Sequence, residues 1–273
     1  MSENVRRPVD HIDGWTETSG VSLRYVVSGN GGPSVVLIHE LGGTLDSWTG
    51  VLGALEPHCT VLRFDQRGHG LSEKVREPFM LDDQVDDLEA VLGAAQPDAP
   101  HWLVGAAAGA AVAVKFAARH PQHVAGIVMC APALNADSSR STYLQSRSAL
   151  ATTHGMRAIA DASLERSYPE AIRDAAVYRD YRARFLANDP VSYGLANQAL
   201  SDMELRDELR ALRCACLVLA GRYDTLRPPD LLKAQAALLA RARFVEIDCA
   251  HLMPVQAPAE LASYILDFVR RRP

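Results

Sequence analysis

Short apolar runs alternate along most of this chain with segments whose apolar residues recur at helical spacing. Residues 35–39 form a continuous apolar run, which is typical of a strand buried in a parallel sheet. Leu81, Val85, Leu88 and Leu92 recur every three or four residues and predict a helix. The remaining predicted strands are 22–28, 60–64, 101–105, 124–130, 215–220 and 243–247, and the other predicted helices are 107–119 and 258–270.

Residues 135–209 interrupt this alternation, because they carry no strong strand signal and several helical stretches rich in alanine and arginine. We therefore predict an α/β fold with a mostly parallel twisted sheet flanked by helices. Its core would comprise 1–134 and 210–273, with 135–209 as a helical cap inserted between two strands. An insertion that follows the strand ending at Cys130 would lie over the carboxyl ends of the strands, where open α/β sheets bind ligands.

Composition narrows the class of protein. The chain has 273 residues, 48% of them hydrophobic and 22% charged, and a net charge of −5. This charge gives no basic surface for nucleic acid or an anionic membrane, and the longest apolar runs are too short to span a bilayer. Residues 1–4 lack the apolar core of a signal peptide, so we expect a cytoplasmic protein. Its expected partner is a small molecule, and the sequence leaves a homo-oligomer open.

The cysteines give no metal-binding pattern. Cys214 and Cys216 are two residues apart, but no second cysteine pair or histidine pair at ligand spacing accompanies them. We expect all five cysteines to be reduced thiols, and we expect neither a metal site nor a cofactor.

The most informative motif lies at residues 104–109, which read Val-Gly-Ala-Ala-Ala-Gly. The glycine spacing is that of a G-x-S-x-G nucleophile elbow, with Ala107 at the position of the serine. Gly105 and Gly109 supply the small neighbours that this tight strand-to-helix turn needs, between a predicted strand and a predicted helix. Alanine cannot attack a carbonyl, so the chain has the surroundings of a serine-type hydrolase without the nucleophile.

Further loops at predicted strand ends complete such a site. Residues 38–43, Ile-His-Glu-Leu-Gly-Gly, would contribute the Leu41 N–H to an oxyanion hole, and the Ala108 N–H would be the second donor. Asp224 and His251 each follow a predicted strand, so Asp224 could hold His251 as the general base. The chain order of nucleophile, acid and histidine is the one expected of this architecture.

On these motifs the chain resembles the α/β-hydrolase superfamily over essentially its whole length. Residues 64–72, Phe-Asp-Gln-Arg-Gly-His-Gly-Leu-Ser, are a hallmark of that superfamily. Residues 41–48, 155–161, 164–166 and 202–206 resemble the 3-oxoadipate enol-lactonases in particular. The resemblance implies the α/β-hydrolase fold and hydrolysis of a small ester, lactone or amide through an acyl-enzyme. It also implies an anionic substrate from aromatic or heteroaromatic ring cleavage.

Three residues are candidates for substrate binding. Glu40 stands where the family usually has glycine or another small residue. It could orient water, bind a substrate amine, alter the preferred substrate charge, or point away and hydrogen-bond a loop. One or two arginines of the cap could pair with a substrate carboxylate, and we select Arg147. Tyr168 is the third candidate.

Two explanations of Ala107 compete. A deliberate serine-to-alanine substitution would leave a pocket that traps substrate, whereas a natural pseudo-hydrolase would only bind a ligand. We favour the first because Asp224, His251 and the oxyanion loop persist. The alternatives on the same fold are a C–C bond hydrolase, a cofactor-free enzyme that uses the His–Asp dyad as its base, and a non-catalytic ligand-binding protein.

Overall fold

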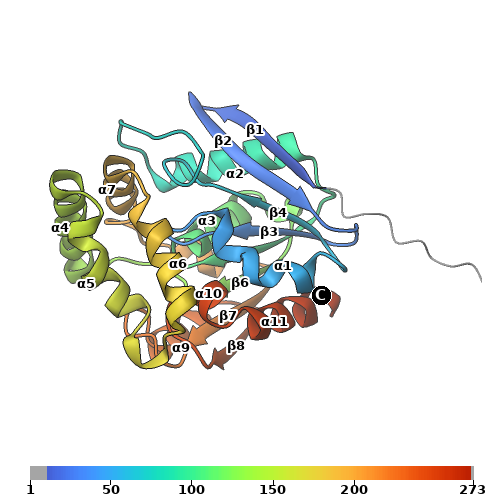
Figure 1. The fold of residues 1–273 in the computed structure, drawn as a ribbon. Coiled ribbons are helices and arrows are strands. Elements are labelled where there is room, and N and C mark those ends of the chain that lie inside the picture. Colours follow the sequence, from blue (N-terminus) through green and yellow to red (C-terminus); the bar gives the residue numbers. More distant parts are fainter. Residues whose placement is uncertain (1–10, 272–273) are drawn as a thin grey trace, which may run out of the picture.

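The computed structural model describes residues 11–271, so residues 1–4, considered above for a signal peptide, lie outside it. Its centre is an eight-stranded sheet in the order β1-β2-β4-β3-β5-β6-β7-β8 (Figure 1). β1 pairs with β2 and β2 with β4 in antiparallel fashion, and the other neighbours are parallel. The strands are β1 Ile12–Thr18, β2 Val21–Ser28, β3 Ser34–Ile38, β4 Thr60–Phe64, β5 His101–Ala106, β6 Val124–Cys130, β7 Ala215–Gly221 and β8 Ala242–Ile247.

Helices cover both faces of this sheet, which explains its continuous apolar strands. Val36 and Ile38 of β3 belong to one apolar core, whereas Val35 and Leu37 belong to the core on the other face. Successive side chains of a strand point to opposite faces, so a strand covered on both sides must be apolar throughout. The first core includes residues of α2 Leu81–Ala95, α3 Ala108–Arg119 and α9 Pro229–Ala236, and the second includes residues of α1 Thr49–Leu55, α10 Met253–Gln256 and α11 Pro258–Arg270.

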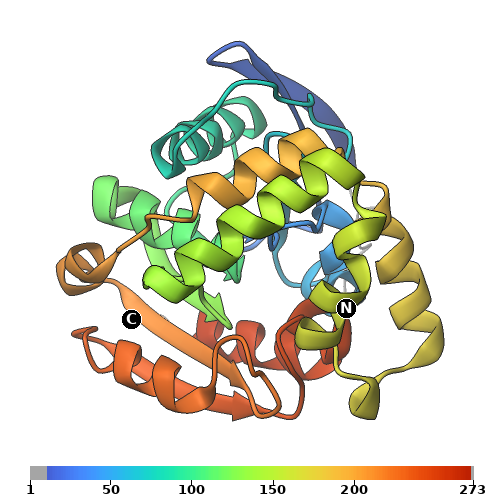
Figure 2. The same cartoon turned by 90° about the vertical axis from the view of Figure 1, so that its left-hand side faces the viewer.

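The segment between β6 and β7 is helical and lies at one end of the sheet (Figures 1 and 2). Its helix α4 runs along α7, as Figure 2 shows, and a small apolar cluster that includes Ile159, Leu164, Tyr181 and Phe185 holds its helices together. None of the helices within residues 11–271 is long and apolar enough to cross a bilayer. The helices are α4 Ser138–His154, α5 Arg157–Ser167, α6 Ala175–Leu186, α7 Pro190–Ala199 and α8 Arg206–Ala211, and the short 3₁₀ turns are η1 Leu45–Trp48, η2 Pro121–His123 and η3 Glu170–Ile172.

The predicted fold class is confirmed, and all seven predicted strands are present with ends shifted by at most one residue. The sequence reading missed β1, α1, α9 and the short α10. β1 is an exposed edge strand without a buried face, so it lacks the apolar alternation that identifies a strand. α1 is short and contains Gly50 and Gly53, which are poor helix formers. The predicted helix 107–119 begins one residue later, because Ala107 has a non-helical backbone.

Candidate active site

The backbone at Ala107 is strained. This residue joins β5 to α3 with φ 47° and ψ −107°, a region that residues with a Cβ rarely adopt. Such a conformation costs of order 1–3 kcal/mol and persists only where the surroundings enforce it. Here the Ala107 N–H donates to the Cys130 carbonyl at 2.9 Å, and the Ala107 carbonyl accepts from the Ala133 N–H at 3.0 Å. The chain therefore makes the tight strand-to-helix turn expected from the motif, with the methyl group of Ala107 at its tip.

The two glycines of the motif allow the elbow to pack closely. A Cβ on Gly105 would lie 2.5 Å from the Cα of Ala110, and one on Gly109 would lie 2.2 Å from the Ile38 carbonyl oxygen. Real side chains do not tolerate such contacts. The glycine spacing therefore reflects the close approach of α3 to the ends of β3 and β5.

Asp224 and His251 meet beside this elbow from the ends of β7 and β8. The Asp224 Oδ2 lies 2.8 Å from His251 Nδ1, and its Oδ1 accepts the backbone N–H groups of Leu226 at 2.8 Å and Arg227 at 3.0 Å. Burial alone would raise the pKa of Asp224, but His251 and these donors outweigh burial and lower it. Asp224 thus stays a carboxylate bonded to Nδ1, which leaves Nε2 of His251 for the cavity.

Two backbone amides flank the elbow. Leu41 and Ala108 both line the cavity that contains Ala107. Within residues 11–271, neither the Leu41 N–H nor the Ala108 N–H donates a hydrogen bond to a protein acceptor. Free amides of this kind, one at the start of α3 and one in the loop after β3, are the donors that an oxyanion requires.

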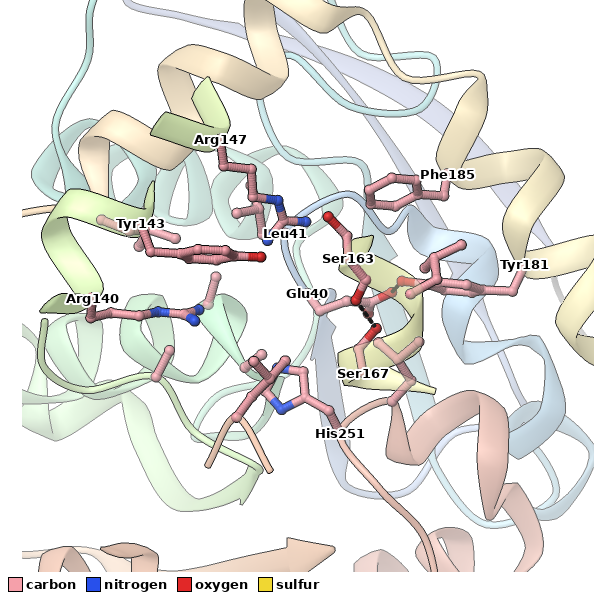
Figure 3. Close-up of a pocket in the computed structure, with 17 residues that line it drawn as sticks. Glu40, Leu41, Arg140, Tyr143, Arg147, Ser163, Ser167, Tyr181, Phe185 and His251 are labelled. Carbon is pink, nitrogen blue, oxygen red and sulfur yellow. Dashed lines mark hydrogen bonds between the residues drawn. The ribbon is translucent and has the colours of Figure 1, made fainter. Parts of the chain in front are cut away.

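The cavity itself has a volume of about 60 Å³ and lies between the strand ends and α4, α5 and α6 (Figure 3). It brings together the sequence candidates Glu40, Leu41, Ala107, Ala108, Arg147 and His251, whereas Asp224 lies behind His251. The remaining lining residues are Ala133, Arg140, Tyr143, Ser163, Leu164, Ser167, Tyr181, Phe185, Leu200, Leu226 and Leu252.

Comparisons with known proteins show the family and the fold of this chain. A model of the serine aminopeptidase S33 family matches residues 33–246. The chain belongs to this family. Among curated relatives, a 3-oxoadipate enol-lactonase of Acinetobacter baylyi is 22% identical over 92% of this chain and 94% of its own length. A pyrrolizixenacetamide deacetylase of Xenorhabdus hominickii is 24% identical over 90% and 94%.

A solved structure gives the same result. The enol-lactonase from Burkholderia xenovorans LB400 superimposes with a TM-score of 0.88 at 27% identity, over 94% of this chain and 100% of that chain. The resemblance to α/β-hydrolases of enol-lactonase type is therefore confirmed, and this S33 family member has the α/β-hydrolase fold.

The hallmark segment 64–72 of this family member positions the oxyanion loop. The N–H of Gly42 donates to His69 Nε2 at 3.3 Å, and the N–H of Leu45 donates to Asp65 Oδ1 at 2.8 Å. His39 in turn accepts from the Gln66 N–H through Nε2 at 3.0 Å. Both imidazoles are buried beneath the site, and neither lines the cavity.

The cap presents cations to the cavity. Arg140, Tyr143 and Arg147 lie three and four residues apart on α4 and therefore share one helix face. The guanidinium carbons of Arg140, Arg147 and Arg166 lie 5.4, 5.9 and 4.7 Å from the centre of the Tyr143 ring. Sequence reading selected Arg147 but missed Arg140. The spacing of seven residues from Arg147 was the available signal.

These cations are not neutralised within the described chain. The Nε atoms of Arg140 and Arg147 are buried without a hydrogen-bond partner among residues 11–271. Burial, followed by the nearby Arg227 and Arg147, lowers the pKa of Arg140 to about 10. Burial alone would raise the pKa of Tyr143, but the three surrounding guanidinium groups outweigh burial and lower it. This wall therefore suits an anion.

Glu40 lies in the oxyanion loop and is only 3% exposed. Its Oε1 accepts the Ser47 hydroxyl and the Tyr181 hydroxyl, each at 2.8 Å, so it links the core to α6. Its Oε2 is buried and has no partner among residues 11–271. The carboxylate therefore takes part in a loop hydrogen bond and also lines the cavity.

Tyr168 is placed differently from the other candidates. It is 2% exposed, packs edge-on against Tyr178 with ring centres 5.5 Å apart, and is not among the residues that line the cavity. Its position at the end of α5 directs the ring into the apolar cluster of the cap instead.

Because His39 and His69 are buried, we expect the free energy of unfolding to depend on pH. Burial lowers the pKa of His39 to about 4 and that of His69 to about 3, from an ordinary 6.5. Between the lowered pKa values and 6.5, the histidines of the unfolded chain bind protons that those of the folded chain do not. The free energy of unfolding therefore rises with pH in this range. We expect His69→Gln to reduce the slope of unfolding free energy between about pH 4.5 and 6 by about 1.4 kcal/mol per pH unit.

Urea denaturation at several pH values measures this slope. The exposed His154 provides the matched control, because His154→Gln should leave the slope as it is. An unchanged slope in His69→Gln would show that His69 is not held neutral in the folded protein.

Proposed function

We propose that this S33 family member is a hydrolase of small anionic esters, lactones or amides whose nucleophile position holds alanine. It therefore binds its substrate without cleaving it. The observation that carries the proposal is the strained elbow at Ala107, which retains its geometry beside the Asp224–His251 pair. The relatives named as enol-lactonases support a lactone or ester, and the relative named as a deacetylase supports an acetamide. Aromatic or heteroaromatic ring cleavage is the proposed source of the substrate.

With a serine at position 107, the site would carry out acyl transfer. The serine hydroxyl would attack the carbonyl while Nε2 of His251 accepts its proton, and Asp224 would hold the imidazole and stabilise its cation. The Leu41 and Ala108 amides would donate to the oxyanion. His251 would then protonate the leaving group and activate the water that cleaves the acyl-enzyme.

The cationic wall supports an anionic substrate. Arg140 and Arg147 reach the cavity from one face of α4, and no carboxylate of the described chain neutralises their buried nitrogens. A substrate carboxylate can accept charge-assisted hydrogen bonds from guanidinium groups in this arrangement. Binding there would place the rest of a small molecule toward His251 and the elbow (Figure 3).

A second candidate follows from the intact Asp224–His251 pair. Because its 2.8 Å contact does not involve residue 107, the imidazole could serve as a base for proton abstraction without any covalent intermediate. This reading and that of a non-catalytic binding protein each give a different outcome in the experiment below.

Ala107→Ser tests the proposal. We expect the variant to hydrolyse members of a panel of anionic lactones, esters and amides, with a rate gain on the order of 10⁶ over the alanine chain. Ala107→Ser combined with His251→Ala is the matched control and should lose that gain. Steady-state hydrolysis measures the gain, and calorimetric binding to the unmodified chain measures retained affinity.

Two other results would contradict the proposal. Turnover by the unmodified chain at the rate of the serine variant would favour the dyad enzyme. Tight binding with no hydrolysis by either chain would favour a non-catalytic binding protein.

Arginine substitutions in the Ala107→Ser background test the substrate charge. We expect Arg140→Ala and Arg147→Ala each to raise KM for an anionic ester by about tenfold or more, because a charge-assisted hydrogen bond is lost. The exposed Arg157 lies outside the cavity, so Arg157→Ala should leave KM as it is. If neither cavity variant raises KM above that of Arg157→Ala, the anion site is wrong.

A further inference from the structure

The cavity has walls of opposite charge. Figure 3 shows Arg140, Tyr143 and Arg147 on one side and Glu40 with Tyr181 on the other. All five residues line the same cavity. A small ligand in this space therefore meets cations at one end and a carboxylate at the other.

Glu40 is held in place by a built environment. Ser47 and Tyr181 both donate to its Oε1 at 2.8 Å. A Cβ on Gly43 would lie 2.3 Å from that same oxygen, so the loop glycine leaves room for the carboxylate. The side chain therefore has a fixed position.

The charge of Glu40 has no counter-ion. Its two hydrogen-bond donors are neutral hydroxyls, its Oε2 has no partner, and no cation among residues 11–271 pairs with it. Burial raises the pKa of Tyr181 well above its ordinary range, and the neighbouring Glu40 raises it further. The Tyr181 hydroxyl therefore keeps its proton and donates it to Glu40 in a hydrogen bond. In a water-poor site an unpaired charge acts strongly on neighbouring charges.

Glu40 lies at the end of the cavity where the substrate carbonyl would react. Glu40 directly precedes Leu41, whose amide is the proposed oxyanion donor, and both residues line the cavity beside Ala107. The cationic wall on α4 is the other end of the cavity. A carboxylate at the elbow end would repel a second anion placed there.

We propose that Glu40 selects substrates by the charge beside the reacting carbonyl. The site binds substrates that place one carboxylate at the arginine wall and carry a neutral or cationic group next to the carbonyl, and it excludes an anionic group at that second position. This inference rests on the proposed function, because it uses the anion site on α4 to fix the orientation of the substrate.

The test measures binding to the unmodified alanine chain by calorimetry at pH 6. The probes are glutaric acid monomethyl ester, the α-methyl ester of glutamic acid, and the glutarate ester with a second carboxylate on the carbon beside the ester carbonyl. Each probe keeps the distal carboxylate. We expect the second carboxylate to weaken binding at least about tenfold relative to the glutarate ester, and the ammonium group not to weaken it.

Glu40→Gln should reduce the carboxylate penalty to about twofold or less. The glutamine oxygen can still accept from Ser47 and Tyr181, so the change removes charge and keeps shape. The exposed Glu77 lies outside the cavity, and Glu77→Gln should keep the full penalty.

The outcomes separate the proposed role of Glu40 from the proposed anion site on α4. If the unmodified chain binds all three probes alike, or if the penalty persists in Glu40→Gln, Glu40 does not set the selectivity. The first of these results needs no variant, so it stands even if Glu40→Gln does not fold. If no probe binds at all, the anion site of the proposed function fails, and this inference fails with it.

Discussion

The strained turn at residue 107 is the constraint on which the rest of the site depends. The positive φ of Ala107 is held by its hydrogen bonds to Cys130 and Ala133. Directly after this turn α3 approaches the carbonyl of Ile38 so closely that only a glycine fits at position 109. The same approach brings the start of α3 beside the oxyanion loop that follows β3. The strained turn, the start of α3 and the loop after β3 therefore form one unit, with the methyl group of Ala107 at the turn.

A second layer holds that unit from below. Asp65, His39 and His69 are buried, and each accepts a hydrogen bond from a backbone N–H group. The donors are Leu45, Gln66 and Gly42, in that order. Their burial shifts the histidine pKa values down, so the layer is uncharged in its imidazoles at neutral pH. Above it, the cavity is polarised between the arginines of α4 and Glu40. The proposed selection of substrates by charge depends on both walls of the cavity.

Much of this arrangement could be predicted from sequence. Buried parallel strands are recognisable as apolar runs, and the residues at their carboxyl ends meet at one edge of the sheet. The sequence therefore predicts that Asp224 and His251 lie close together. β1 could not be predicted, because its pairing with β2 and not its own pattern makes it a strand. Arg140 and Tyr168 depended on how the cap helices dock. The spacing of seven residues from Arg147 could have indicated that Arg140 shares its helix face, but not that this face lines the cavity. No pattern in the sequence shows that the Tyr168 ring packs within the cap, outside the cavity.

The most direct test of the central claim is covalent labelling of residue 107. Intact-protein mass spectrometry after incubation with a small alkyl fluorophosphonate reports whether an activated nucleophile sits at the elbow. If the site lacks only its nucleophile, Ala107→Ser will gain one adduct at residue 107, and the unmodified chain will gain none there. A serine variant that stays unlabelled while it folds normally would show that the elbow, the dyad and the amides do not form a working acyl-transfer site.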